Sequence, residues 1–198
     1  LFRHAGLVLR DDTVLGSASS FNQFLIQKQI STLNLPTAYW MHLTGMLDEE
    51  QIRLSPQIKS VIIGGEEALP GVLRKWQNYC QQHQLQPQLF NTYGPTEATV
   101  IASRTDISQY PVSNAALPIG QAIDNSALYI VTEQLQLLPA GCIGEIAICG
   151  PGLAQGYLNQ ASLTAEKFVR LQNGERAYLS GDLGYYFKGQ LYYLGRKD

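Results

Sequence analysis

Residues 88–100 read QLFNTYGPTEATV, a short apolar segment followed by a Gly-Pro turn, two hydroxyl side chains and a carboxylate. The segment at 88–91 predicts a strand, and in α/β sheets ligands bind at the carboxyl ends of strands. Tyr93 offers a flat face for a base, and Asn91 offers both a donor and an acceptor for a base edge. Thr96 offers a hydroxyl for a phosphate oxygen, and Glu97 a hard oxygen ligand for Mg²⁺. Tyr-Gly-Pro alone would be better explained by a solvated turn, so the whole string carries the prediction of a nucleotide site.

Upstream of this stretch, strand-sized and helix-sized apolar patterns alternate. Such alternation predicts a parallel sheet covered by helices. We expect strands at residues 7–9, 32–35, 61–63 and 88–91, and helices at 21–29, 38–47 and 70–82.

Downstream, from about Ile119, the pattern changes to strand-sized pieces separated by Gly and Pro. These pieces are ALYIV, GEIAICG, RAYLSG and the pair LGYYF and QLYYLG, which flank Lys188 and Gly189. The expected fold is therefore α/β, with a helix-covered parallel sheet followed by a β-rich, hairpin or barrel-like subdomain. We expect the boundary to divide residues 1–115 from residues 116–198.

Composition excludes several classes of protein. The chain has 198 residues, of which 45% are hydrophobic and 15% charged, and its formal net charge of -2 argues against nucleic-acid or membrane partners. Its three cysteines show no CxxC spacing, which disfavours a disulfide framework or a zinc site. Since no disulfide framework is indicated, we expect a protein of the reducing cytoplasm. No apolar run has transmembrane length, and the N-terminus lacks the features of a signal peptide. Since the chain lacks an initiator Met, we expect a piece of a longer protein.

NTYGPTEATV resembles the adenine and phosphate motif of the adenylate-forming (AMP-binding) superfamily, which includes nonribosomal peptide synthetase adenylation domains, acyl-CoA synthetases and luciferases. Further strings are similar to other motifs of that superfamily, in family order: LNLPTAYW, SVIIGGEEALP, LPIGQAIDNSALYIV, GEIAICGPGLAQGYLNQASLTAEKFV, RAYLSGDLGYY and YLGRKD. The resemblance covers essentially the whole chain. It is strongest to an amino-acid adenylation domain, and it implies a fragment of that domain's large N-terminal part.

The resemblance also implies a role for each matching residue. Thr96 and Glu97 are the implied catalytic residues, with Glu97 holding Mg²⁺. Asp182 is implied to accept both ribose hydroxyls, and Asp198 to mark the hinge toward a smaller C-terminal subdomain. The implied nucleotide-binding residues are Gly64, Gly65, Glu66, Asn91, Tyr93, Thr96, Asp182, Tyr193 and Arg196.

Alignment to the family motifs further implies a substrate pocket lined by Leu33, Ile62, Gly64, Thr92, Val100 and Ile101. All of these except Thr92 are apolar or lack a side chain, so we expect the pocket to offer no charged partner. Burying a charged substrate there would be costly. The pattern favours a small or medium apolar amino acid, such as proline or valine, over an acidic, basic or indole side chain.

The implied reaction activates an amino acid with ATP as aminoacyl-AMP, releases pyrophosphate, and passes the acyl group to the phosphopantetheine thiol of a peptidyl carrier protein. The family's phosphate loop, substrate-anchoring aspartate and C-terminal lysine fall outside this chain, so we expect the isolated fragment to be inactive. Two alternatives stay open. One is an acyl-CoA, aryl-acid or D-alanine carrier-protein ligase, and the other is a degenerate, non-catalytic nucleotide-binding module.

The segment GPGLAQGYLNQASLTAEKF is interpreted as structural. Its glycines suit turns, and a helix is expected to begin behind Thr164 as its cap. No chemistry is assigned to this segment.

Overall fold

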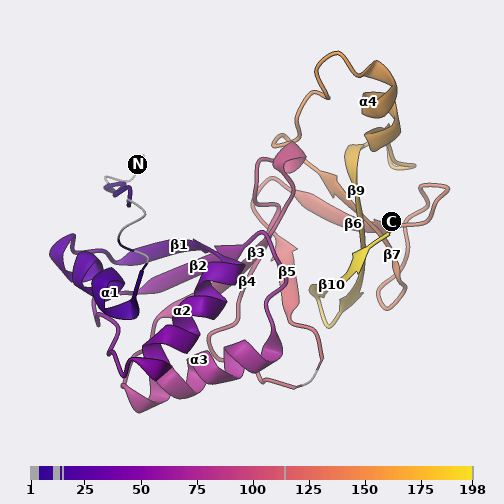
Figure 1. The fold of residues 1–198 in the computed structure, drawn as a ribbon. Helices are drawn as coiled ribbons and strands as arrows, with labels where there is room; N and C mark the ends of the chain where they lie inside the picture. The colour runs from indigo at the N-terminus through magenta and orange to yellow at the C-terminus, as the bar shows by residue number, and fades with distance from the viewer. Residues whose placement is uncertain (1–4, 11–13, 15, 114, 198) are drawn as a thin grey trace.

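The computed structural model describes residues 5–10, 14, 16–113 and 115–197, which form a helix-covered part and a β-rich part (Figure 1). The helix-covered part contains α1 (Ala18–Gln27), β1 (Thr32–Pro36), α2 (Thr37–Glu49), β2 (Ser60–Gly64), α3 (Pro70–Gln82), β3 (Gln88–Tyr93), the short 3-10 helix η2 (Thr96–Ala98) and β4 (Ser103–Asp106). The β-rich part contains β5 (Pro118–Ala122), β6 (Ala127–Val131), β7 (Gly144–Cys149), α4 (Ala161–Lys167), β8 (Phe168–Arg170), β9 (Arg176–Phe187) and β10 (Gln190–Arg196).

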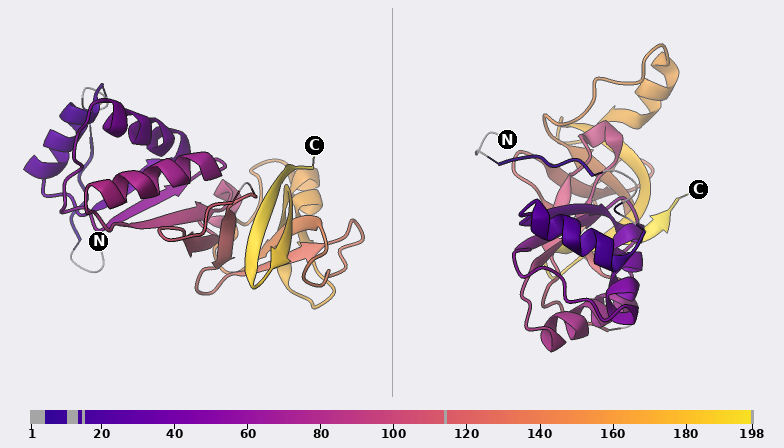
Figure 2. Two further views of the ribbon diagram at one scale, coloured as in Figure 1. Left: turned by 90° about the horizontal axis from the view of Figure 1, so that it is seen from below. Right: turned by 60° about the vertical axis from the view of Figure 1, so that its left-hand side comes forward.

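Strands β1, β2 and β3 are parallel, and their register places Leu33 beside Val61 and Val61 beside Leu89. Because side chains alternate between the two faces of a strand, these three residues share one face. Helices α1, α2 and α3 cover that face, as Figure 2 shows from below. Trp40 and Trp76 are fully buried in the resulting core, with their ring centroids 6.2 Å apart. Apolar burial therefore fixes the position of the parallel strands.

Helix α3 has the bounds that its sequence predicts. Pro70 occupies its first turn, where the missing N–H costs no hydrogen bond. Leu73, Trp76 and Cys80 recur at helical spacing and are buried against the sheet. The helix thus holds the segment after β2 against the end of the sheet.

The opposite face of these strands carries Ile62, Phe90 and Thr92. Ile62 lies beside Phe90, and Thr92 beside Arg104 of the antiparallel strand β4. Ile62, Phe90 and Thr92 are only partly buried, and α1, α2 and α3 all lie on the other face. One face of the sheet is thus packed against helices, and the other, called the open face below, is not covered by them.

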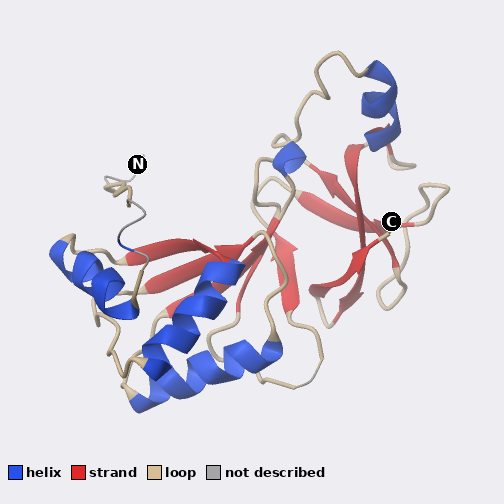
Figure 3. Cartoon of the chain, in the orientation of Figure 1, coloured by secondary structure: helices blue, strands red, loops and turns tan. Residues whose placement is uncertain are grey.

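The strands continue from one part into the other, in the order β1-β2-β3-β4-β5-β10-β9-β7-β6, with β8 paired to β9 (Figure 3). Strand β5 makes the connection, because it pairs with β4 on one side and with β10 on the other. The hairpin of β9 and β10 turns at Lys188 and Gly189, as the sequence predicts.

Two strand predictions were wrong. Residues 7–9 form no strand, and Leu7 and Leu9 are 71% and 81% exposed, because three apolar residues without a partner strand bury little surface. The pieces expected as two strands around Gly181 form the single long strand β9, which pairs with β7 and β10 along its length. Pairing on both sides carries the strand through the glycine.

The predicted start of α4 was also wrong. The helix begins at Ala161, so Thr164 lies inside it. The Thr164 hydroxyl instead accepts a hydrogen bond of 2.9 Å from the backbone N–H of Tyr157. It therefore holds the preceding loop and does not cap the helix.

The α/β fold class with a β-rich second part is confirmed. The division between residues 115 and 116 stays a prediction, and Asp198 lies outside the described residues. Among the described residues, no helix is both long and apolar enough to span a membrane.

Candidate functional site

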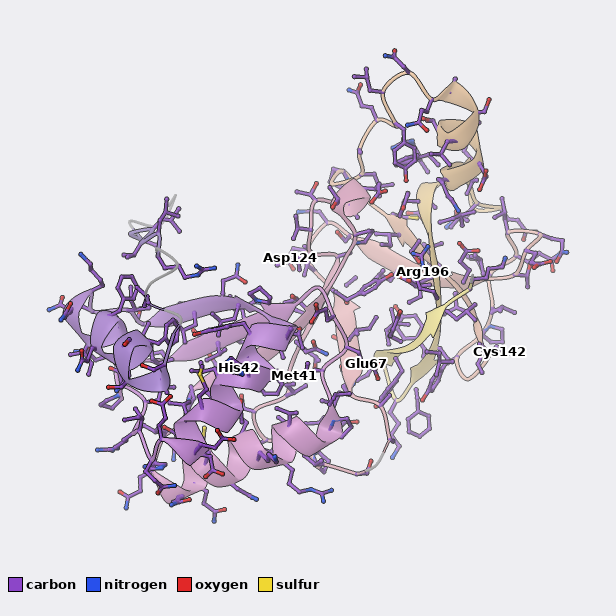
Figure 4. All side chains as sticks on the ribbon, viewed as in Figure 1. Met41, His42, Glu67, Asp124, Cys142 and Arg196 are labelled. Carbon is purple, nitrogen blue, oxygen red and sulfur yellow. The ribbon has the colours of Figure 1, made fainter. Side chains whose placement is uncertain are left out.

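A cavity of about 290 Å³ lies at the carboxyl ends of β2 and β3, where the two parts of the chain meet. Glu67 and Arg196 both line it and come from the two different parts (Figure 4). The lining residues are 65–68, 91–95, Leu117, Ile119, Asp182, Tyr193 and Arg196. Seven of the nine predicted nucleotide-binding residues line this cavity. Gly64 and Thr96 do not, although each is next in sequence to a residue that does.

The turn after β2 explains two of the predicted glycines. A Cβ on Gly64 would collide with the hydroxyl of Thr92, which donates a 2.7 Å hydrogen bond to the carbonyl of Ile63. Gly65 has a φ of +89°, a conformation that glycine adopts without steric cost. The Gly-Gly pair therefore allows β2 to lie close to β3 and the chain to turn along the cavity.

Asn91 is 4% exposed, and its side-chain N–H donates a 2.9 Å hydrogen bond to the carbonyl of Pro118 in β5. A buried amide is stable only when such partners are present. Asn91 thus joins β3 to β5 at the base of the cavity while lining it.

Asp182 is the centre of the polar side of the cavity. The Tyr93 hydroxyl donates a 2.6 Å hydrogen bond to its Oδ2, and Arg196 Nη1 lies 3.5 Å from its Oδ1. Burial raises the pKa of the Asp182 carboxyl above its ordinary value, against the opposing effects of Tyr93 and Arg196. Burial, together with this hydrogen bond, also raises the pKa of Tyr93. A carboxylate offers about four acceptor positions, so Asp182 can accept further hydrogen bonds from a ligand.

Two aromatic rings complete this side. The rings of Tyr93 and Tyr193 are tilted by 38°, with their centroids 6.4 Å apart. Both line the cavity, so flat apolar surface lies next to the carboxylate. This combination suits a ligand with an aromatic ring and a hydroxylated neighbour.

Glu97 and Thr96 lie in η2, just past the cavity wall that ends at Pro95. Thr96 is exposed, whereas the Glu97 carboxylate accepts a 2.6 Å hydrogen bond from the Tyr157 hydroxyl. Burial acts to raise the pKa of Glu97, but hydrogen bonds, led by that from Tyr157, outweigh it and leave this pKa below its ordinary value. The carboxylate is therefore ionised at neutral pH.

The donor set at Glu97 fits magnesium bound together with a phosphate. No group of three or more His, Cys, Asp or Glu side chains that could hold a metal occurs among the described residues. Mg²⁺ commonly binds through one or two carboxylates and completes its shell with water and phosphate oxygens. Glu97 can supply such a carboxylate, whereas the part of the chain that the structure describes offers no cage for a tightly enclosed ion.

A second cavity, of about 590 Å³, lies on the open face of the sheet. It brings together three predicted pocket residues, Ile62, Thr92 and Ile101. Arg104 and Asp124 also line it, so the expectation of a pocket without charged groups does not hold for this cavity. The sequence reasoning missed both charges because it followed only the family positions, whereas the pairing of Thr92 with Arg104 across the strands becomes visible in the sheet.

The other predicted pocket residues lie elsewhere. Leu33 is buried beneath the helices, on the face opposite to Ile62. Gly64 adjoins Thr92, but it lines neither cavity. Val100 is 66% exposed and has a φ of +71°.

The family model described as AMP-binding enzyme matches residues 4–158. Tyrocidine synthase 1 from Brevibacillus parabrevis is 34% identical over 201 residues, which cover 100% of this chain and 17% of that protein. Surfactin synthase subunit 3 from Bacillus subtilis (strain 168) is also 34% identical, over 98% of this chain and 15% of that protein. The chain therefore spans about a sixth of the length of these curated relatives.

Solved structures agree with the family match. PA1221, a nonribosomal peptide synthetase protein containing adenylation and PCP domains, superposes with a TM-score of 0.78 and 28% identity, over 92% of this chain and 36% of that one. The α-methyl-L-serine-AMP bound form of the nonribosomal peptide synthetase FmoA3 gives a TM-score of 0.79 and 28% identity, over 92% of this chain and 20% of that one.

Proposed function

Since this chain belongs to the AMP-binding enzyme family, we propose that it forms the nucleotide-binding part of a ligase that activates an amino acid with ATP. The cavity that joins Tyr93, Asp182, Tyr193 and Arg196 carries this proposal. Its polar and aromatic groups match the parts of an adenosine, and its volume lies near the lower end of the roughly 300–1,000 Å³ of ligand sites.

Each wall has a separate task in this proposal. Tyr193 and Tyr93 both present ring surface to the nucleoside. Asp182 accepts the ribose hydroxyls through the acceptor positions that Tyr93 and Arg196 leave available. Charge-assisted hydrogen bonds of this kind are roughly twice as strong as neutral ones. Arg196 places its positive charge beside the ribose and the α-phosphate, where charge develops during the reaction.

In the first half-reaction, a carboxylate oxygen of the amino acid attacks the α-phosphorus of ATP and pyrophosphate leaves. When bound, Mg²⁺ neutralises phosphate charge. Glu97 holds its carboxylate at the end of the site, and the Thr96 hydroxyl donates to a phosphate oxygen. These residues act by positioning and by charge, since the phosphoryl chemistry needs no protein nucleophile.

In the second half-reaction, the phosphopantetheine thiol of a peptidyl carrier protein attacks the aminoacyl carbonyl and AMP leaves. The nonribosomal peptide synthetase relatives support this acceptor, as does the presence of a PCP domain in PA1221. The amino acid itself lies against the open face of the sheet, near the second cavity.

We further propose a small or medium apolar amino acid as the substrate. Ile62, Thr92 and Ile101 form a mostly apolar surface in the second cavity, which favours apolar side chains by desolvation. Arg104 is exposed and lies over the Phe90 ring, 5.7 Å from its centroid, so its charge reaches solvent.

Pyrophosphate exchange by the full-length protein that carries this chain tests the proposal. ATP–pyrophosphate exchange is measured with a panel of amino acids and with fatty and aryl acids. We expect exchange with proline, valine or a similar aliphatic residue to exceed exchange with aspartate or lysine by about tenfold or more, because uncompensated burial of a charge costs more than 1.4 kcal/mol. Preference for aspartate would contradict the apolar pocket and assign a role to Arg104. Preference for a fatty or aryl acid, or no exchange with any acid, would contradict amino-acid activation itself.

A further inference from the structure

The loop of residues 150–157 reaches the proposed magnesium carboxylate, although its sequence predicts only turns. The Tyr157 hydroxyl donates to Glu97 Oε1 at 2.6 Å. The Tyr178 hydroxyl of β9 lies 3.3 Å from the Tyr157 hydroxyl. Glu97 and Tyr157 are 60 positions apart in the sequence, so the contact depends on the folded structure.

Two further hydrogen bonds join the loop to η2 itself. The backbone N–H of Ala154 donates to the carbonyl of Glu97 at 2.8 Å. The Thr99 hydroxyl donates to the carbonyl of Gly152 at 2.6 Å. The loop thus holds both the main chain and the side chain of Glu97.

The loop is in turn fixed to strand β9. Arg176 of β9 donates to the carbonyls of Ala154 and Gln155, at 2.9 and 2.8 Å. The guanidinium of Arg176 also lies 4.6 Å from the centroid of the Phe168 ring. One side chain of the sheet therefore orients two consecutive carbonyls of the loop.

Tyr157 is fixed independently of its hydroxyl. Its backbone N–H donates to the Thr164 hydroxyl at 2.9 Å, and its ring meets Phe168 edge-on with the centroids 5.7 Å apart. A Cβ on Gly156, the residue before it, would collide with Thr164. The ring therefore has a defined position from which its hydroxyl points at the carboxylate.

The backbone after Glu97 supports a functional interpretation of this arrangement. Thr99 and Val100 have φ values of +57° and +71°, which are unfavourable for β-branched residues. Such conformations persist where surrounding contacts hold them, and they concentrate at functional sites. The hydrogen bond from Thr99 to Gly152 is one such contact.

We propose that Tyr157 is a positioning residue, whose hydroxyl fixes the Glu97 carboxylate in the orientation in which it meets the magnesium of bound MgATP. The loop of residues 150–157 acts as the support that holds Tyr157 and η2 together. This inference rests on the proposed function, because it specifies how that same site is organised. Tyr157 itself lines neither of the two cavities.

Calorimetry with the full-length protein tests the inference. ATP affinity is measured with and without Mg²⁺ for the wild type, for Tyr157→Phe and for a control, Tyr186→Phe. The control loses a tyrosine hydroxyl that donates to the Leu128 carbonyl, away from the site. Mg²⁺ should increase the ATP affinity of Tyr157→Phe about fivefold less than it increases that of the wild type, because one hydrogen bond to a charged group is lost. The ATP affinity without Mg²⁺ should be the same in both proteins. Tyr186→Phe should leave both affinities unchanged.

A second pair of variants separates positioning from general destabilisation. In a Glu97→Gln background, Tyr157→Phe should have no further effect on the Mg²⁺ dependence, because the hydroxyl acts through that carboxylate. If Tyr157→Phe did not fold, Thr164→Ala, which removes the hydrogen bond to the Tyr157 backbone, should weaken the Mg²⁺ gain in the same direction. An unchanged Mg²⁺ gain in a folded Tyr157→Phe or Thr164→Ala variant would overturn the inference. A wild type that bound no ATP would instead contradict the proposed function.

Discussion

The two walls of the cavity that we propose binds the nucleotide are built from different groups. The wall formed at the ends of β2 and β3 rests on a core of buried apolar side chains that includes Trp40 and Trp76. The wall formed by β9 and β10 contributes the Asp182 carboxylate, which accepts a hydrogen bond from Tyr93 and lies beside the Arg196 guanidinium. The first wall is anchored in this apolar core, and the second brings a partly buried carboxylate next to a guanidinium. Changes in the first wall should therefore alter folding stability strongly, whereas changes at Asp182 should alter stability little and nucleotide affinity more.

The largest effect is expected in the apolar wall. Trp76→Ala should lower the free energy of unfolding by about 3–5 kcal/mol, because it removes a fully buried indole and leaves a cavity between α3 and the sheet. Phe187→Ala is the matched control, since this aromatic residue of β9 is 52% exposed and should cost at most about 0.5 kcal/mol. Chemical denaturation measures both variants. Equal losses of unfolding free energy in the two variants would show that the apolar core does not set the first wall apart from the second.

The smallest effect is expected in the charged wall, and it depends on pH. The folded-state pKa of Asp182 is raised, chiefly by burial, so the folded chain holds this proton more tightly than the unfolded chain does. The associated stability is present below the unfolded pKa and is lost as pH rises through the folded pKa. At neutral pH, Asp182→Asn should therefore raise the melting temperature of the nucleotide-free protein by at most about 2–4 °C.

Melting curves at pH 7.5 and at a pH below the Asp182 pKa check this effect. The gain should disappear at the lower pH, where the wild-type carboxyl is protonated. A gain that is independent of pH, or a loss at neutral pH, would show that the ion pair with Arg196 stabilises the charged wall and would reverse the comparison.

Sequence reasoning worked best where local patterns decide the structure. Helix α3 was predicted with its observed bounds because a proline in the first turn and regular apolar spacing mark it. Nine residues were predicted to bind the nucleotide, and seven of them line one cavity. Their role in binding stays a prediction. These residues lie in short motifs, so each motif could be placed separately.

Sequence reasoning failed where contacts join distant segments. Nothing in the local sequence pairs Tyr157 with Glu97, or Thr92 with Arg104, because the first contact depends on how a loop crosses η2 and the second on strand register. Leu33 was placed in the substrate pocket, although the side-chain alternation of β1 turns it into the helix-covered core. A strand motif predicts position along the chain better than it predicts which face a residue occupies.

The contribution of Asp182 to AMP affinity decides whether the cavity at the ends of β2 and β3 is the nucleotide site. AMP affinity is measured by calorimetry for the full-length protein and for its Asp182→Ala variant, with circular dichroism as the check on folding. We expect at least about a tenfold loss of affinity, since each hydrogen bond to a charged group contributes about 1.5–3 kcal/mol. Unchanged AMP affinity in a folded Asp182→Ala variant would contradict the assignment of this cavity as the nucleotide site.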